Sequence, residues 1–428
     1  MKKALSLIIC LLMILGIFGG CSNGEKPAET TAAPEGPATL SVGFGRGDIT
    51  PRVPVPLGGL KNSETRISTD VRDPLYSNCI AFTDGTGNTF MLIVSDLLSV
   101  SQPLAEARGE IAQKYNIPIT NIWIATTHNH SGPAMDTVNY AIEQTSEWTR
   151  QQIVAAADEA MADRKPAKMY ITDTYPEKLN FVRHYLMDDG SIVGDNFGTT
   201  QGKQYVGHVT EVDNQMQLIK FTREGGKDIV LMNWQGHPTG HNEYHYSILS
   251  GISVATHKME DDLDCHFAYV LGASGNVNNR SRITSEIITP NYEQHYTTLA
   301  EKAQEAMANM REVEIGNVKV VNEEVPCTVK LGTGILKITV YTASIGDVAF
   351  VAAPYEMFDT KGKFVKDNSP FEMTFVSSCT NGSNSYIPTK PTYEYGGYEV
   401  ESSLVAAGSA EQLADAMVGA LNQMYQPK

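Results

Sequence analysis

Ile122-Trp123-Ile124-Ala125-Thr126-Thr127-His128-Asn129-His130-Ser131-Gly132-Pro133 runs from a strand into a turn. Its first five residues are apolar or β-branched, which is typical of a buried strand. The polar turn that follows carries two histidines. Since residues i and i+2 of an extended chain point the same way, we expect His128 and His130 to share a face. They would lie at the end of the strand, where α/β proteins place their sites.

Two neighbouring imidazoles suit a metal ligand and its neighbour, or a general base and its neighbour. The HxH spacing alone leaves a third interpretation open, namely a pair of surface or core histidines.

A second apolar run ends in the same way, at Gln235-Gly236-His237-Pro238. This makes His237 another candidate for chemistry. His241 and His245 have the four-residue spacing of a helical ligand pair, but the Pro and Gly around them argue against a helix. We therefore interpret His241 and His245 as loop residues.

A third strand leads into a loop of small and amide side chains at residues 272–279. Such a loop can place hydrogen-bond donors near an oxyanion, and the alternative is an ordinary tight turn. The Gly43–Asp48 stretch has the glycines of a nucleotide loop, but more Pro and Gly follow it instead of a helix. The dinucleotide interpretation therefore lacks its structural context.

Strands and helices alternate along the rest of the chain, which predicts a single large α/β domain with mixed sheets, flanking helices and a site at the strand ends. The expected strands cover residues 79–83, 89–94, 121–127, 169–172, 215–221, 229–234, 267–271, 318–321, 336–342, 348–352 and 373–377. The expected helices cover 103–115, 146–163, 294–310 and 409–425. In the last helix, Ser409 and Gln412 suggest a capping box.

The charge of the chain excludes several classes of function. The 428 residues carry a formal net charge of −16, which argues against nucleic-acid binding and against electrostatic attachment to anionic lipid. The hydrophobic content of 42% excludes a chain that is disordered throughout.

The N-terminus has the pattern of a bacterial lipoprotein signal peptide over residues 1–20. Lys2 and Lys3 precede an apolar run, and small residues precede Cys21. We expect acylation of Cys21, an extracytoplasmic protein on the bacterial cell membrane, and membrane contact through this lipid only. A plain secretory peptide and a retained membrane anchor are the alternatives. Residues 21–39 have the composition of a flexible tether, and residues 40–428 form the expected catalytic domain.

The remaining cysteines, Cys79, Cys265, Cys327 and Cys379, are widely spaced and form no CxxC pair. A cysteine zinc site is therefore not expected. Export would permit disulfides, but no pairing follows from the sequence, and buried free thiols are the alternative.

Together, these motifs resemble the N-terminal catalytic domain of the neutral, zinc-dependent ceramidases. The resemblance runs in family order over residues 40–425, and the THxHSGP motif is its most specific part. The matching segments are Gly45–Pro51, Thr127–Pro133, Asn233–Thr239, Gly275–Asn278, Tyr386–Thr389 and Gly397–Glu399.

The resemblance implies an α/β catalytic domain with one Zn²⁺ held by two His, a Glu and a Tyr. Carried over by position, these ligands are His128, His237, Glu356 and Tyr386. From the residues alone, the alternatives are a surface carboxylate for Glu356 and packing aromatics for Tyr386 and Tyr398. The resemblance also places His130 beside the metal, and makes Tyr398 and Arg183 candidates for binding the substrate carbonyl or hydroxyls.

The chain departs from the family at Asn278, where ceramidases carry a Ser described as the nucleophile; Ser274 lies four residues earlier. Because an amide cannot attack a carbonyl, we expect a metal-activated water as the nucleophile. His130 would accept its proton and Asn278 would polarise the scissile carbonyl. Full-length ceramidases also carry an immunoglobulin-like C-terminal domain, and the resemblance covers their catalytic domain only.

We therefore expect an extracytoplasmic zinc hydrolase that cleaves an N-acyl, ceramide-like bond in a small amphipathic amide or lipid. One alternative is the same site acting on another amide or ester, from cell-wall or glycan material. Others are a lipoprotein that binds lipid or carbohydrate without catalysis, and a structural surface protein. The oligomeric state and the metal loaded do not follow from the sequence.

Overall fold

The computed structural model describes residues 39–60, 63–194, 202–239, 244–280, 284 and 287–427. The expected signal peptide, Cys21, nearly all of the expected tether and His241 lie outside these described residues. Within the described ranges, every helix is too short or too polar to cross a bilayer.

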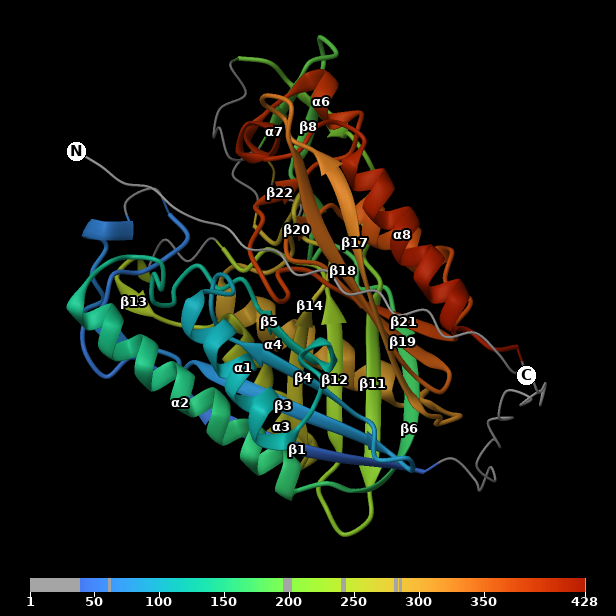
Figure 1. Cartoon of the computed structure of the whole chain (residues 1–428). Coiled ribbons are helices and arrows are strands. Elements are labelled where there is room, and N and C mark those ends of the chain that lie inside the picture. The colour runs from blue at the N-terminus through green and yellow to red at the C-terminus, as the bar shows by residue number, and fades with distance from the viewer. Residues whose placement is uncertain are drawn as a thin grey trace, which may run out of the picture. The chain divides into compact units, whose positions relative to one another are not determined.

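Nine strands form one large mixed sheet, ordered β14-β12-β11-β6-β1-β3-β4-β5 with β16 paired to β6 (Figure 1). The pairs β4–β5 and β12–β14 are parallel, and the other neighbours are antiparallel. The strands are β1 (Leu40–Asp48), β3 (Tyr76–Asp84), β4 (Thr89–Ser95), β5 (Ile122–Thr126), β6 (Lys165–Thr174), β11 (Met216–Arg223), β12 (Ile229–Trp234), β14 (His266–Leu271) and β16 (Arg311–Val313).

A second sheet of four strands has the order β17-β18-β19-β21, in which β19 and β21 are parallel. Its strands are β17 (Val318–Thr328), β18 (Ile335–Ile345), β19 (Val348–Ala352) and β21 (Met373–Ser377). Small sheets surround the site: β2 (Asp70–Val71) with β13 (Ser247–Ile248), β7 (Phe181–Val182) with β15 (Val277–Asn278), β20 (Glu356–Met357) with β22 (Tyr386–Ile387), and β8 (His184–Met187) with β9 (Ile192–Gly194) and β10 (Tyr205–His208).

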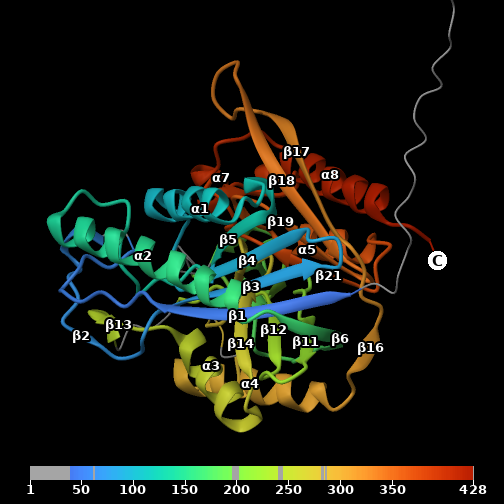
Figure 2. The ribbon, with the colours of Figure 1, turned by 60° about the horizontal axis from the view of Figure 1, so that its bottom comes forward.

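The helices cover the outer faces of both sheets. They are α1 (Gln102–Tyr115), α2 (Tyr140–Ala162), α3 (Gly251–Leu263), α4 (Tyr292–Met307), α5 (Asp359–Asp367), α6 (Thr392–Tyr395), α7 (Tyr398–Ser402) and α8 (Ser409–Met424), with short 3₁₀ turns η1 (Ser63–Thr65) and η2 (Ile119–Asn121). Figure 2 shows α3 and α4 on the side of the large sheet away from β17, β18 and α8.

The fold has four layers of secondary structure, with apolar clusters at the three interfaces between them, because each sheet is apolar on both faces. One cluster lies between the two sheets, where the Phe82 and Phe350 rings meet at 6.2 Å. Separate clusters join the large sheet to α1 and α2, and to α3 and α4. A further cluster joins the smaller sheet to α5 and α8. The predicted fold class, a large α/β domain with mixed sheets flanked by helices, is confirmed.

The glycines of Gly43-Phe44-Gly45-Arg46-Gly47 let α2 lie directly on β1. A Cβ on Gly45 would lie 2.0 Å from the carbonyl oxygen of Ala156, and one on Gly43 would lie 2.0 Å from that of Ala160. The stretch that carries nucleotide-like glycines is therefore a strand under a helix, which agrees with the rejection of a dinucleotide loop.

Two sequence-based expectations about helices need correction. Helix α2 begins at Tyr140 instead of residue 146, because Asn139 caps it by accepting from the Ala141 N–H at 2.8 Å. The capping box expected in α8 is absent: the N-cap is Gly408, and the Ser409 hydroxyl donates instead to the Ala406 carbonyl. Strand β1 and helices α3 and α5 were not predicted, since glycines and charged residues dilute their periodicity.

Candidate metal centre

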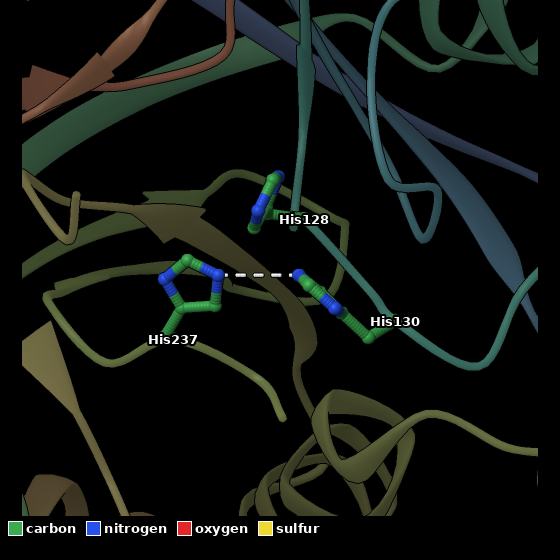
Figure 3. A group of neighbouring side chains, drawn as sticks. All are labelled: His128, His130 and His237. Atoms are coloured by element: carbon green, nitrogen blue, oxygen red, sulfur yellow. Dashed lines mark hydrogen bonds between the residues drawn. The ribbon is translucent and has the colours of Figure 1, made fainter. Parts of the chain in front are cut away.

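Three histidines converge at the carboxyl ends of two strands of the large sheet (Figure 3). His128 and His130 follow β5, and His237 follows β12. Their ligand nitrogens lie within 4.8 Å of one another, and His130 Nε2 lies 3.1 Å from His237 Nε2. This grouping of His128, His130 and His237 is the core of the site that the sequence indicated.

Glu356 enters the same cluster from the smaller sheet. It follows β19 and begins β20, and its Oε2 lies 3.3 Å from His128 Nε2 and 3.8 Å from His237 Nε2. The side chain is only 13% exposed, so the interpretation of Glu356 as a surface carboxylate does not describe its position.

The outer nitrogens of two histidines point to backbone carbonyls. His128 Nδ1 lies 2.8 Å from the Leu98 oxygen, and His237 Nδ1 lies 3.3 Å from the Ser274 oxygen. A carbonyl only accepts, so the shorter contact favours the His128 tautomer with hydrogen on Nδ1 and a lone pair on Nε2, which is the usual arrangement of a metal-binding histidine. His237 Nδ1 also lies 3.4 Å from Arg183 Nη1, which can only donate, so the two neighbours of His237 Nδ1 favour opposite tautomers.

His128 and His130 meet for a different reason than the predicted one. An extended chain would place both rings on one face, but β5 ends at Thr126 and His128 has a φ of 60°, in the left-handed region. The rings nevertheless lie 4.8 Å apart, because the turn, and not strand alternation, brings them together.

His130 is held from outside the HxH motif by Gly59. This glycine has a φ of 87°, and a Cβ on it would lie 2.4 Å from His130 Nδ1. The buried Arg66 guanidinium donates to the carbonyls of Gly58 and His130, both at 2.9 Å. The Gly58–Gly59 segment thus forms the wall against which the His130 ring rests.

Tyr386 lies beside Glu356, and Tyr398 lies beside Tyr386. Tyr386 pairs with Glu356 in the parallel β20–β22 register, and its ring is 5.5 Å from that of Tyr398. Burial and the charge of Glu356 raise the pKa of Tyr386 well above its usual value, and Arg183 opposes this. Both tyrosines therefore border the cluster.

Arg183 joins several of these residues from the end of β7. Its guanidinium is 3% exposed and lies 2.7 Å from Glu399 Oε1 through both Nε and Nη2. Nη1 donates to Asn278 Oδ1 at 3.3 Å and lies 3.4 Å from His237 Nδ1. Contacts thus connect all eight predicted site residues, with Asn278 beside His237 and with Tyr398 joined to the others through Tyr386.

The loop that carries Asn278 is fixed by a buried carboxylate. Asn276 and Asp359 exchange two hydrogen bonds, at 2.7 and 2.8 Å, and the Gly275 N–H donates to the Met357 carbonyl at 2.7 Å. Burial raises the pKa of Asp359 to about 6. The loop is therefore anchored to the segment that carries Glu356.

The electrostatics of the three imidazoles are coupled. Burial disfavours charge on His128, but the Glu356 carboxylate and the Cys379 sulfur together outweigh it and raise the pKa of His128 well above its usual value. Burial and the neighbouring His128 charge together lower the pKa of His130 and of His237 well below theirs.

A metal ion fits this donor set. His128 Nε2 and Glu356 Oε2 are buried without a hydrogen bond, although buried polar atoms normally have one. Glu356 Oε2 lies 3.3 Å from His128 Nε2 and 3.8 Å from His237 Nε2, close to the ligand spacing of about 3.4 Å that follows from tetrahedral Zn–N bonds of about 2.0–2.1 Å. The missing hydrogen bonds of His128 Nε2 and Glu356 Oε2, and the spacing of these atoms, therefore fit the ligands of a metal ion.

The four described cysteines, Cys79, Cys265, Cys327 and Cys379, are buried and free, in agreement with the alternative that the sequence left open. Cys379 Sγ lies 3.7 Å from His128 Nδ1, on the side of the ring away from Glu356.

Comparisons with known proteins bear on the fold. No family model matches the chain, and no curated protein matches it. A solved ceramidase in complex with C2 superposes with a TM-score of 0.73 at 16% identity, covering 91% of this chain and 76% of that one. The neutral ceramidase of Pseudomonas aeruginosa has a TM-score of 0.72 with the same identity and coverage. The chain therefore has a ceramidase-like fold.

Sequence reasoning missed several residues that support the cluster. The carbonyls of Leu98 and Ser274 carry no side-chain signal. The pair Gly58-Gly59 was a visible cue for a close approach. Glu399 stands inside a motif already noted, but nothing in the sequence linked it to Arg183.

Proposed function

We propose that the chain is a zinc-dependent hydrolase that cleaves the N-acyl bond of a small amphipathic amide or lipid. The observation that carries this proposal is the convergence of His128 Nε2, His237 Nε2 and Glu356 Oε2, with the outer nitrogens of both histidines on carbonyls. The ceramidase-like fold, shared with proteins described as ceramidases, supports the choice of an amide substrate.

In this proposal, His128, His237 and Glu356 hold the ion, with Tyr386 beside them as the fourth ligand. A zinc ion held there would supply Lewis acidity, polarising a carbonyl and lowering the pKa of a water molecule. His130 is the proton acceptor, since its Nε2 lies 3.1 Å from a ligand nitrogen and its ring is fixed by Gly59.

Asn278 takes the role of a donor to the substrate carbonyl. A guanidinium can only donate, so the Asn278 end that faces Arg183 is the amide oxygen, and the nitrogen is directed elsewhere. An amide N–H aimed at a developing oxyanion contributes to catalysis of acyl transfer. Tyr398, next to Tyr386, is assigned to the hydroxyls of the substrate.

The proposal includes an extracytoplasmic location. It supposes that residues 1–20 are removed, that Cys21 is acylated, and that residues 21–39 tether the domain to the membrane. Incorporation of labelled palmitate into the wild-type protein and its loss in Cys21→Ala would test this part independently of activity.

Two measurements on purified protein test the enzymatic proposal. Elemental analysis should find about one zinc per chain, lost in His128→Ala and His237→Ala. N-acyl sphingosines with short and long chains should be hydrolysed, and the chelated protein should be inactive until zinc is restored. Absence of bound metal in the wild type would overturn the proposal.

One observation favours a second candidate, the same metal site acting on another amide or an ester. Asn278 stands where the resembling family carries a Ser, so the chain need not share the substrate of that family. Assay of N-acetylated sugars and of acyl esters beside the sphingosine amides would separate the two candidates.

A further inference from the structure

A row of side chains leads from half-buried Tyr395 through buried His184, Glu399 and Arg183 to the candidate metal centre. The Tyr395 hydroxyl lies 3.1 Å from His184 Nδ1, and His184 Nε2 lies 3.0 Å from Glu399 Oε2. The other oxygen of Glu399 lies 2.7 Å from both Nε and Nη2 of Arg183. Figure 1 shows α6, α7 and β8, which carry Tyr395, Glu399 and His184, gathered at one end of the domain.

The chemistry of each group fixes the direction of these hydrogen bonds. A carboxylate only accepts, so His184 donates to Glu399 through Nε2 and Arg183 donates to it through Nε, while Arg183 Nη2 lies 2.7 Å from the same carboxylate oxygen as an ion-pair contact. With Nε2 protonated, the neutral His184 ring accepts the Tyr395 proton at Nδ1. We call the row Tyr395, His184, Glu399 and Arg183 the relay.

The charges of the relay are balanced within it. The side chains of Arg183 and Glu399 are each only 3% exposed, so water screens them little. Burial by itself would raise the pKa of Glu399, but Arg183 and His184 lower it to about 2, and the carboxylate stays charged. A buried carboxylate fixed on both oxygens leaves the guanidinium a single orientation.

The guanidinium in turn touches the site. Its remaining Nη1 donates to Asn278 Oδ1 at 3.3 Å and lies 3.4 Å from His237 Nδ1. The plane of a guanidinium is rigid, so the two Glu399 contacts determine where Nη1 points. The orientation of the Asn278 amide therefore depends on a carboxylate that does not itself touch Asn278.

We propose that Glu399 is a positioning residue, which acts through Arg183 to hold Asn278 with its amide nitrogen toward the substrate carbonyl. His184 and Tyr395 complete the same function by holding the second oxygen of Glu399. The inference rests on the proposed hydrolase function and assigns to the relay the stabilisation of the oxyanion, not the binding of metal.

A double-mutant cycle tests the inference. Glu399→Gln should lower kcat about 10–100-fold, as removal of an outer partner does, with KM and zinc content nearly unchanged. In an Asn278→Ala background, the same substitution should change kcat less than about threefold, since the group that it positions is gone. Glu401→Gln, on the exposed side of α7, is the matched control and should behave as wild type.

A purely structural role of Glu399 would give the same fold-loss in both backgrounds, and that result would overturn the inference. Should Glu399→Gln fail to fold, Tyr395→Phe removes one hydroxyl at the far end of the relay and enters the same cycle. A smaller loss of kcat is then expected, again suppressed by Asn278→Ala.

Crystal structures separate this inference from the proposed function. In Glu399→Gln, or in Tyr395→Phe if the first variant does not fold, the Arg183 guanidinium and the Asn278 amide should rotate from their wild-type positions. Unmoved side chains contradict the positioning role, whatever the enzyme hydrolyses. An inactive wild type would refute the hydrolase function and leave this structural comparison decisive for the relay.

Discussion

His128 Nε2 faces Glu356 Oε2 at 3.3 Å across the boundary between the two sheets. The histidine follows a strand of the large sheet and the glutamate follows a strand of the smaller one. Neither atom has a hydrogen bond, although both are buried. A carboxylate oxygen that faces a ring nitrogen without a hydrogen bond is an arrangement that could hold a metal ion between the two atoms.

Loss of either ligand should abolish metal binding. We expect His128→Ala and Glu356→Gln to reduce zinc affinity by more than the 10–100-fold that outer partners of ligands contribute. Titration of the metal-free proteins with zinc measures this directly. His257→Ala, an exposed histidine on α3, provides the control, and wild-type affinity in either ligand variant would refute the assignment.

The contact between Gly59 and His130 predicts a selective effect on catalysis. Gly59→Ala would put a Cβ 2.4 Å from His130 Nδ1 and displace the ring. Gly87→Ala imposes the same backbone strain, since φ is 89° there, but meets no atom within 4 Å. Both variants should lose about 1–2 kcal/mol of stability, and only Gly59→Ala should also lower kcat. Equal kcat values in the two variants would contradict a role for His130.

The orientation of Asn278 predicts the effect of a one-atom change. Asn278→Asp keeps an oxygen toward Arg183 but replaces the amide donor with a second acceptor. Loss of an oxyanion donor typically costs about 10²–10³ in kcat. Steady-state kinetics should show this loss while the zinc content stays constant. Unchanged kcat would mean that the Asn278 nitrogen plays no part in the reaction.

Burial of Asp359 predicts a defined pH dependence of stability. Its pKa is raised from 3.8 to about 6 in the folded protein, so between these values the folded state binds more protons than the unfolded state. The free energy of unfolding therefore falls as pH rises through this window, by up to about 3 kcal/mol at about 1.4 kcal/mol per pKa unit.

Denaturant unfolding of wild type and Asp359→Asn from pH 4.5 to 7.5 measures that contribution. The free energy of unfolding of the variant, relative to that of the wild type, should rise with pH, because the variant cannot ionise at this position. A difference independent of pH would show that Asp359 titrates normally.

The close approach of β1 and α2 predicts a large packing effect from one methyl group. Gly45→Ala would place a Cβ 2.0 Å from the Ala156 carbonyl oxygen and force the helix outward. Overpacking of this kind costs about 1–3 kcal/mol. Gly109→Ala, in α1 and open within 4 Å, should instead stabilise by about 0.5–1 kcal/mol. Thermal unfolding should show that Gly45→Ala lowers the stability of the protein and that Gly109→Ala raises it.

Local patterns were sufficient to predict the strands that end at the site. The apolar runs before His128 and His237 are continuous, and such runs indicate buried strands independently of context. The histidines at their ends could therefore be chosen as candidates, but β5 and β12 are not neighbours in the large sheet and run in opposite directions, so the meeting of His128 and His237 follows from the fold.

The remaining features depend on contacts between distant segments, which no local pattern encodes. The left-handed conformation of His128 and the carbonyl of Leu98 behind its ring arise from packing of the turn. His184 has an ordinary strand context, and only the fold brings it to Glu399. Gly408 replaces the expected cap of α8 because the preceding loop arrives in a left-handed turn.

The ligands come from both sheets, and this has a consequence for the assembly of the protein. His128 and His237 cannot meet Glu356 until the two sheets have docked, so the complete site forms late in folding. A bound ion would then hold the two sheets together where His128 and His237 meet Glu356. By mass action it would add about 4 kcal/mol to the free energy of unfolding at a thousandfold excess over Kd. The bound metal would thus also stabilise the packing of the two sheets against each other.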